Sequence, residues 1–344
     1  IRLALSDARE RGELPTGFEV LWADTGSDPS RAVAEFRTMA EERGVKLVIG
    51  GATSAEAMAL IPELDDIEVV CLSPSASAPG LAQQSRLFFR IYPSDELEGH
   101  TAANFLFERL GKQDVMLFTG DTEYTRGIKP EFLKQYQENL GGTVVADVAL
   151  TEEGWRQAAA EILGRENVEA VYSIGYAEEI LSVVQYLFEQ GFDGRIVTTS
   201  AFYSGQVIRE AGEAAEGVLF PLPPFDRTSE KEPVLSFVNR YMDTYERAPD
   251  VFAAHGFDAM GLTIQVMNLA SPPETLEILK ALNFGVSEFM GVTGPILFDD
   301  YGDVKHYPMM FIVNEGQVLS FQRYLEAERR RIVSQVQDLL SAGD

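Results

Sequence analysis

Short apolar runs alternate with longer amphipathic stretches along most of the chain. The short runs are rich in β-branched residues and predict strands at residues 18–23, 46–49, 67–72, 87–92, 115–118, 143–150, 170–174, 195–199 and 218–220. The longer stretches repeat their apolar positions at helical spacing and predict helices at residues 29–43, 54–64, 95–110, 127–140, 155–165, 177–190 and 205–211. This alternation favours an α/β fold in which helices cover both faces of parallel sheets.

The alternation of short apolar runs and amphipathic stretches ends at about residue 221, where Pro221, Pro223 and Pro224 interrupt any regular element. Beyond them the pattern predicts helices at residues 232–246, 251–269 and 273–282, and then strands at 294–298, 309–313 and 318–321. A last helix, at residues 325–340, carries one apolar stripe and is expected to pack on its own lobe or on a neighbour. An orientation flat on a membrane surface is the alternative, which the acidic residues of this helix disfavour.

Composition narrows the class of protein. The chain has 344 residues, of which 45% are hydrophobic, and this length is typical of two domains that each bury a core. The net charge of −26 would repel phosphates, which argues against nucleic acid and anionic membranes as partners. The single cysteine, Cys71, lies in an apolar run and is expected in the core, since one cysteine forms no internal disulfide. The sequence shows neither an apolar run of transmembrane length nor a signal-peptide pattern.

Motifs of catalysis and metal binding are missing from the sequence. There is no phosphate-binding loop, no dinucleotide-binding glycine pattern, no zinc-protease helix motif and no nucleophile elbow. The histidines His100, His255 and His306 fall in different predicted segments, and His255 alone has the alternative of facing a site. Pairs of acidic residues lack the spacing of metal ligands. We therefore expect no catalytic residue, no metal site, no cofactor and no enzymatic activity.

Small polar residues follow two predicted strands in the first half of the chain. Strand 46–49 runs into Gly50-Gly51-Ala52-Thr53-Ser54 and a helix, and strand 67–72 runs into Ser73-Pro74-Ser75-Ala76-Ser77-Ala78-Pro79. Ligands of open parallel sheets lie at the carboxyl ends of strands, where a helix N-terminus presents free N–H groups. Ser54 is therefore expected to cap its helix and is a candidate for holding a carboxylate. The loop at residues 73–79 either lines a ligand site or is an ordinary surface turn.

Aromatic residues follow predicted strands in the second half of the chain. Tyr124, Tyr176 and the pair Phe202-Tyr203 each come shortly after a strand. A single aromatic residue at a strand end usually belongs to the core. Three in equivalent positions indicate the wall of a cleft, where aromatic rings supply contact area and a polar tip.

These loops occur in a characteristic order along most of the chain: Asp24-Thr25-Gly26-Ser27-Asp28-Pro29, Val48-Ile49-Gly50-Gly51, Ser73-Pro74-Ser75-Ala76-Ser77-Ala78-Pro79, Phe89-Arg90-Ile91-Tyr92-Pro93-Ser94-Asp95, the Tyr124 loop, Gly175-Tyr176, Glu216-Gly217, Gly291-Val292-Thr293-Gly294 and Phe298-Asp299-Asp300-Tyr301-Gly302-Asp303. In this order and spacing the chain resembles the type I periplasmic binding proteins. The resemblance is to the branched-chain (leucine/isoleucine/valine) amino-acid binding group that serves ABC transporters.

The resemblance implies an α/β fold of two doubly wound parallel-sheet lobes joined by a three-crossover hinge. Lobe 1 is expected at residues 1–95 and 225–300, lobe 2 at 96–224 and 301–325, and a C-terminal helical extension at 326–344. It further implies that a ligand carboxylate binds at Ser54, at the Ser75 carbonyl and at the hydroxyl and N–H of Ser77, while Tyr124 and Tyr176 close over the ligand. The expected ligand-binding residues are Thr53, Ser54, Ser75, Ala76, Ser77, Tyr124, Tyr176, Ser200 and Phe202.

The sequence departs from the family pattern in three places. The family's acid for a ligand ammonium aligns with Ser200, so either Asp121 or Glu178 substitutes for it, or the ligand is a carboxylate without an amine, an amide or an aromatic compound. The family begins with a strand that precedes the helix matching residues 1–11, so we expect natural residues before Ile1. The helix at residues 325–340 is longer than the family's usual ending.

The function that the resemblance implies is that of an extracytoplasmic solute-binding protein. It would capture a small carboxylate-bearing ligand, an amino acid or a related acid or amide, in a cleft between the lobes for uptake by an ABC-transporter permease. It is expected in the periplasm or outside the cell, either free or lipid-anchored, as a monomer or a weak homodimer. The alternative is a sensory or regulatory module of the same fold that docks a partner protein through its surface or through residues 325–340.

Overall fold

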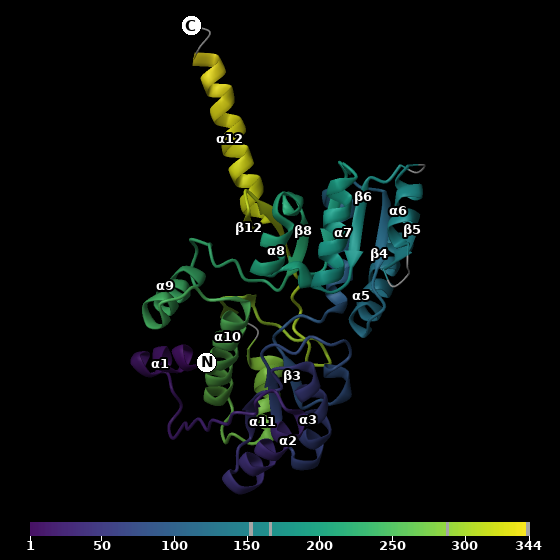
Figure 1. Cartoon of the computed structure of the whole chain (residues 1–344). Helices are drawn as coiled ribbons and strands as arrows, with labels where there is room; N and C mark the ends of the chain where they lie inside the picture. The colour runs from purple at the N-terminus through teal and green to yellow at the C-terminus, as the bar shows by residue number, and fades with distance from the viewer. Residues whose placement is uncertain (151–153, 165–166, 287–288, 342–344) are drawn as a thin grey trace. The chain divides into compact units, whose positions relative to one another are not determined.

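The structure is a computed structural model that describes residues 1–150, 154–164, 167–286 and 289–341 (Figure 1). It forms two compact units. Unit 1 comprises Ile1–Asp95 and Pro223–Tyr307, and unit 2 comprises Glu96–Leu222 and Pro308–Asp344. The chain therefore passes three times between the units. The third passage follows Tyr307, where residue 300 was expected, and the C-terminal helix is grouped with unit 2.

Unit 1 is built on a parallel sheet with the strand order β1-β2-β3, formed by Leu47–Ile49, Val70–Ser73 and Phe88–Arg90. Every residue of β2 is buried, including Cys71, as its continuous apolar run predicts. The helical segments of unit 1 are α1 (Arg2–Arg11), α2 (Pro29–Arg37) with its extension Thr38–Glu42, α3 (Ser54–Ile67), Ala82–Gln84, α9 (Val234–Tyr245), α10 (Val251–Leu269), and α11 (Thr275–Lys280) with its extension Ala281–Gly285. A short hairpin joins β9 (Met290–Gly291) to β10 (Gly294–Pro295).

The apolar run at residues 18–23 is not a strand, contrary to the prediction. Within the described part of unit 1, its backbone makes one hydrogen bond, from Phe18 N to Pro15 O, and no strand pairs with it. A strand exists only through hydrogen bonds to a neighbour, so β-branched composition alone does not create one. The strand predicted at residues 294–298 is likewise reduced to β10, followed by a single bridge between Phe298 and Val304.

Unit 2 holds, among the residues that the structure describes, a seven-stranded sheet with the order β12-β11-β8-β7-β6-β4-β5. Its strands are β4 (Asp114–Thr119), β5 (Thr143–Ala149), β6 (Ala170–Ile174), β7 (Arg195–Thr198), β8 (Leu219–Leu222), β11 (Met309–Asn314) and β12 (Gln317–Ser320). The strands from β4 to β8 are parallel to their neighbours, and β11 pairs antiparallel with both β8 and β12. The helical segments are α4 (Glu96–Asn104) with its extension Phe105–Arg109, α5 (Glu123–Leu133) with its extension Lys134–Asn139, α6 (Trp155–Leu163), α7 (Ala177–Glu189), Ser200–Phe202, α8 (Gly205–Ala211) with Gly212–Ala215, and α12 (Phe321–Ser341).

Successive residues of β4 face opposite sides of this sheet. Val115 and Leu117 pack into the cluster formed with α4 and α5, whereas Met116 and Phe118 pack into the cluster formed with α6 and α7. Both faces of the sheet are therefore covered by helices (Figure 1), as the continuous apolar runs of the strands predict. The α/β class and the doubly wound arrangement expected from the sequence are confirmed for this unit.

Helix α5 begins at Glu123, before the start predicted at residue 127. The Thr122 hydroxyl accepts a hydrogen bond from Thr125 N at 3.2 Å and so caps the helix at that point. Tyr124 consequently lies in the first turn of a helix rather than in a loop. Helix α6 ends at Leu163, and residue 165 of its predicted span lies outside the described residues.

Helices α4 and α5 approach each other closely at Gly99. A Cβ atom at this position would lie 2.5 Å from Ile128 O and 2.9 Å from Phe132 N, so only glycine allows the two backbones this separation. The preceding residue, Glu98, is thereby held against the first turns of α5. This packing helps to set the surroundings of the Glu98 side chain, which belongs to the candidate site in unit 2.

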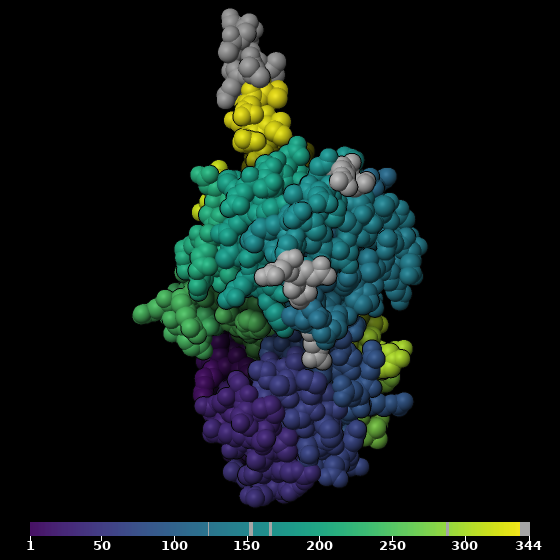
Figure 2. Space-filling model, turned by 45° about the vertical axis from the view of Figure 1, so that its right-hand side comes forward, coloured from purple at the N-terminus to yellow at the C-terminus, as the bar shows by residue number. Residues whose placement is uncertain are grey.

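Among the described residues, the aromatic contacts of the C-terminal helix α12 with unit 2 lie at its start. Phe321 packs edge-on against Phe105 with ring centroids 4.8 Å apart, and Tyr324 contacts the same cluster. Further along, Ile332 and Val333 are about half exposed, and the helix stands clear of the rest of unit 2 (Figures 1 and 2). Of the predicted apolar stripe, Ile332, Val333 and Val336 are therefore not packed on unit 2.

Candidate ligand-binding site

The first part of the candidate site is the N-terminus of α3. Thr53 is the cap: its hydroxyl accepts from Glu56 N at 3.2 Å, and its own N–H donates to Glu56 Oε2 at 3.0 Å. Ser54, which was expected to be the cap, is instead the first helical residue. The first helical hydrogen bond runs from Ala57 N to Thr53 O, so the N–H groups of Ser54 and Ala55 precede it and point out of the helix end, where an anion is favoured.

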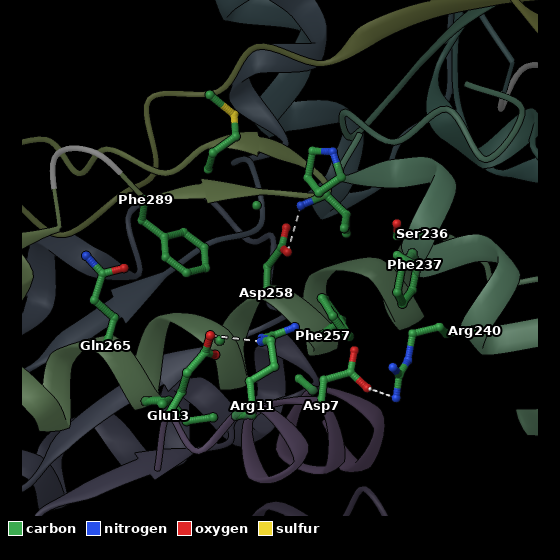
Figure 3. Close-up of a pocket in the computed structure, with 18 of the residues that line it drawn as sticks. Asp7, Arg11, Glu13, Ser236, Phe237, Arg240, Phe257, Asp258, Gln265 and Phe289 are labelled. Carbon is green, nitrogen blue, oxygen red and sulfur yellow. Dashed lines mark hydrogen bonds and ion pairs between the residues drawn. The ribbon is translucent and has the colours of Figure 1, made fainter. Parts of the chain in front are cut away.

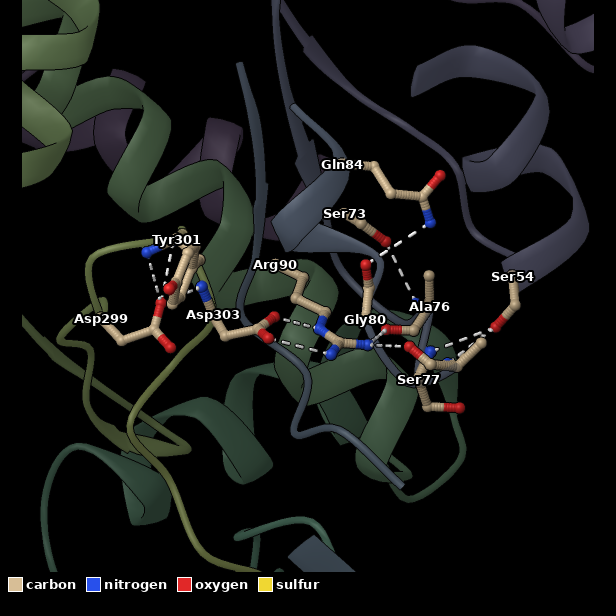
Figure 4. A network of polar contacts seen from close by, with 12 residues as sticks. Ser54, Ser73, Ala76, Ser77, Gly80, Gln84, Arg90, Asp299, Tyr301 and Asp303 are labelled. Carbon is tan, nitrogen blue, oxygen red and sulfur yellow. Dashed lines mark hydrogen bonds and ion pairs between the residues drawn. The ribbon is translucent and has the colours of Figure 1, made fainter. Parts of the chain in front are cut away.

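The Ser54 hydroxyl holds the loop that follows β2. It accepts hydrogen bonds from Ser77 N at 3.3 Å and from Ala78 N at 3.1 Å (Figure 4). The Ser75 hydroxyl donates to Ala52 O at 2.6 Å, and the Ser77 hydroxyl donates to Asp95 Oδ2 at 3.1 Å. The structure therefore brings together Ser54, Ser75 and Ser77, as the strand-end pattern predicts. Of the other two predicted residues here, Thr53 is the cap and Ala76 is fully buried in the same loop.

A buried guanidinium supports this loop from below. The Arg90 side chain is fully buried, donates from Nη1 to Ala78 O at 2.7 Å, and forms a two-pronged ion pair with Asp303 (Figure 4). Asp303 is itself held by the β-turn in which it lies, because Asp299 Oδ1 accepts a hydrogen bond from the Asp303 N–H at 3.0 Å. Burial of a charge is tolerated only when it is paired and hydrogen-bonded, and here the pair fixes carbonyls on either side of Ser77.

The second part of the candidate site lies in unit 2, around Tyr124. Its hydroxyl donates to Glu98 Oε2 at 3.0 Å and lies 3.3 Å from Ser200 Oγ, and Ser200 N also donates to Glu98 Oε2 at 3.0 Å. The ring of Tyr176 stacks on that of Tyr124, with centroids 5.3 Å apart and planes 13° from parallel. Tyr176 is half exposed, so this stack presents an aromatic surface to solvent.

Phe202 does not share that surface, although the sequence analysis included it among the ligand-binding residues. Its side chain is fully buried in the core between α7, α8 and the sheet, and its ring meets Phe220 edge-on. The neighbouring Tyr203 is 38% exposed instead. An aromatic residue that follows a strand can fill the core, and here burial of the larger apolar area decides its orientation.

A buried acid of unit 2, Glu98, lies against Tyr124 and Ser200 and was not among the residues expected from the sequence. The two candidates proposed in its place face elsewhere: Asp121 forms an exposed ion pair with Arg126, and Glu178 is exposed on α7. Glu98 is 5% exposed, and burial raises the pKa of its carboxyl. It lies 102 residues before Ser200 in the sequence, and the fold brings the two together.

His255, for which a position facing a ligand site was the alternative prediction, is a core residue. It is fully buried in α10, its Nδ1 bonds Val251 O at 2.8 Å, and its ring lies against Tyr92. Burial lowers the pKa of His255 to about 4, so the imidazole is neutral at physiological pH.

Among the described residues, no group of His, Cys, Asp and Glu could hold a metal ion. No described helix is long and apolar enough to cross a membrane.

A cavity of about 700 Å³ lies elsewhere in unit 1, lined by α1, α9, α10 and β9 (Figure 3). Two ion pairs lie in its lining: Arg240 lies 2.7 Å from Asp7, and Arg11 lies 2.9 Å from Glu13. None of the residues predicted to bind a ligand lines it. The candidate site is therefore not this cavity.

Comparison with known proteins was made against families, characterised relatives and solved structures. Residues 1–316 match the family model described as "Periplasmic binding protein". A leucine-, isoleucine-, valine-, threonine- and alanine-binding protein from Pseudomonas aeruginosa is 25% identical over 288 residues, covering 83% of this chain and 75% of the relative. A leucine-binding protein from Thermotoga maritima has a TM-score of 0.73 at 25% identity, covering 92% of this chain and 91% of that chain. The branched-chain amino-acid transporter substrate-binding protein from Streptococcus pneumoniae, in complex with isoleucine, has a TM-score of 0.72 at 26% identity, covering 93% and 91%.

Proposed function

The chain belongs to the periplasmic binding protein family, and from that premise we propose that it captures one small carboxylate-bearing molecule, an amino acid or a related acid, for uptake by an ABC transporter. The proposal is carried by the N-terminus of α3. Free backbone N–H groups and the hydroxyls of Ser54 and Ser77 gather there. Groups of this kind bind an anion through hydrogen bonds and through the partial positive charge of the helix end. The relatives from P. aeruginosa, T. maritima and S. pneumoniae, whose names or titles specify amino acids, support the choice of ligand class.

In this proposal Thr53, Ser54 and Ser77 of unit 1 bind the carboxylate, and Tyr124, Tyr176 and Ser200 of unit 2 contact the rest of the ligand. A ligand that touches both units stabilises whichever arrangement brings the two sets of residues together. We take that liganded arrangement to be the one that a permease recognises. The protein would work outside the cytoplasm, free or lipid-anchored, and would release its ligand unchanged.

Replacing Ser54 and Ser77 together by alanine tests the carboxylate site. We expect the double variant to bind its ligand more weakly, by about 1–3 kcal/mol for each charged hydrogen bond that is lost. The measurement is calorimetric titration with L-leucine, L-isoleucine, L-valine, L-threonine and L-alanine, using the probe that the unmodified protein binds most tightly.

Ser85→Ala is the matched control for this pair. Ser85 lies in unit 1 and its hydroxyl donates to Asp65 near the opposite end of α3, at 2.8 Å, so its loss removes one hydroxyl without touching the helix N-terminus. Its affinity should equal that of the unmodified protein. Equal affinity in the Ser54/Ser77 double variant would contradict the assignment of the carboxylate site.

A further inference from the structure

We infer that Glu98 is the group that receives a positively charged amine of the ligand, so that the site selects amino acids over acids that lack the amine. This inference rests on the proposed function, because it adds the second charged end of the same ligand. Its evidence is independent of the α3 site, since Glu98 lies on α4 in unit 2.

Glu98 is a buried acid without a cation. Its side chain is 5% exposed, and in the described part of the chain none of the ion pairs includes it. Asp121 of the same unit differs in this respect, since it pairs with Arg126. A carboxylate that is taken out of water without a counter-charge is costly, and a cation supplied by a ligand removes that cost.

Polar donors hold the Glu98 carboxyl group in place. Tyr124 OH and Ser200 N both donate to Oε2, and the Ser200 hydroxyl contributes a further hydrogen bond. These donors orient the carboxylate but do not neutralise it. Burial raises the pKa of Glu98, and an ammonium group beside this side chain would lower it again and hold the carboxylate in its charged form.

Two further acceptors stand next to this carboxylate. Tyr124 OH and Ser200 Oγ lie 3.3 Å apart, and both are hydroxyl oxygens with lone pairs. An ammonium group carries three N–H donors, which a carboxylate oxygen and two hydroxyl oxygens can satisfy together. The half-exposed Tyr176, stacked on Tyr124, places this group of acceptors beside an aromatic surface that can contact an apolar side chain.

The test pairs each amino acid with the acid that lacks only its amine. L-leucine is compared with 4-methylpentanoate, L-valine with 3-methylbutanoate and L-alanine with propanoate, by calorimetric titration of the unmodified protein and of Glu98→Gln. Glutamine keeps an oxygen that accepts from Tyr124 OH and Ser200 N but has no charge. We expect the unmodified protein to bind the best amino acid at least about 100-fold more tightly than its partner acid.

In Glu98→Gln we expect the affinity for the amino acid to fall by about 100-fold, while the affinity for the partner acid changes by less than about threefold. Glu178→Gln, which neutralises an exposed acid of the same unit, should leave both affinities unchanged. Equal losses for both members of a pair, or equal affinities for both in the unmodified protein, would overturn the role of Glu98 while leaving the carboxylate site standing. Binding of no probe at all by the unmodified protein would overturn the proposed function and this inference together.

Discussion

Replacing Asp303 by alanine should destabilise unit 1 by about 3–5 kcal/mol, because it leaves the fully buried guanidinium of Arg90 without its counter-charge. The ion pair has two contacts, and Arg90 also donates to Ala78 O. Removing one partner of such a pair costs more than the pair contributes, since the remaining charge stays out of water. Urea denaturation of the variant and of the unmodified protein measures the difference in the free energy of unfolding.

Asp300→Ala is the control for this prediction. Asp300 lies in the same turn but is exposed, so its removal should change the free energy of unfolding by less than about 0.5 kcal/mol. We also expect Asp303→Ala to weaken ligand binding, because Arg90 holds the Ala76 and Ala78 carbonyls on either side of Ser77. Equal stability of the two variants would show that the buried pair does not support the loop.

Replacing Asp258 by alanine is the second change with a large expected effect. Its carboxylate is 1% exposed and accepts from Val292 N at 2.8 Å, from Thr293 N at 2.8 Å and from Thr293 Oγ1 at 2.6 Å. Each donor left unsatisfied should cost about 1–3 kcal/mol, so the connection between β9 and β10 loses its anchor. The exposed Asp243 on α9 provides the control, since Asp243→Ala should leave thermal and urea unfolding unchanged.

Asp258 also makes stability depend on pH. Burial raises its pKa from 3.8 to about 6, above the value in the unfolded chain. The folded state therefore binds the proton more tightly, and the stability that this contributes is present below the unfolded pKa and is lost as pH rises through about 6. Between pH 7 and pH 4 the stability of the unmodified protein should rise relative to Asp258→Asn, by an amount on the order of 3 kcal/mol. A constant difference over that range would contradict the raised pKa.

The sequence predicts the fold, and it predicts which polar residues gather beside the N-terminus of α3, because both depend on local pattern. Apolar runs give the strands of both sheets, and the polar residues after β1 and β2 give Ser54, Ser75 and Ser77, since the carboxyl ends of neighbouring parallel strands meet at one edge. The prediction from sequence is wrong where a local pattern forms its structure only with a partner that is distant in the chain. Residues 18–23 have strand composition without a paired neighbour, and Phe202 follows a strand yet fills the core.

The buried acid Glu98 was missed for the same physical reason. Glu98 reads as one more acidic position on a helix, and apart from the adjacent Gly99 nothing near it in the sequence distinguishes it. Its partners Tyr124 and Ser200 come from distant segments of the chain, which the fold brings to α4. The one local signal is Gly99, because a glycine inside a helix is unfavourable unless a neighbour must come close.

The central claim is that this chain binds one small carboxylate-bearing molecule and does not transform it. Calorimetric titration of the unmodified protein, stripped of bound solute by unfolding and refolding, against a panel of amino acids and simple carboxylic acids tests this most directly. The account predicts saturable binding of one molecule per chain by at least one member of the panel, and mass spectrometry of the released probe should recover it unchanged. Absence of binding across the whole panel, or recovery of a product in place of the probe, would contradict the account.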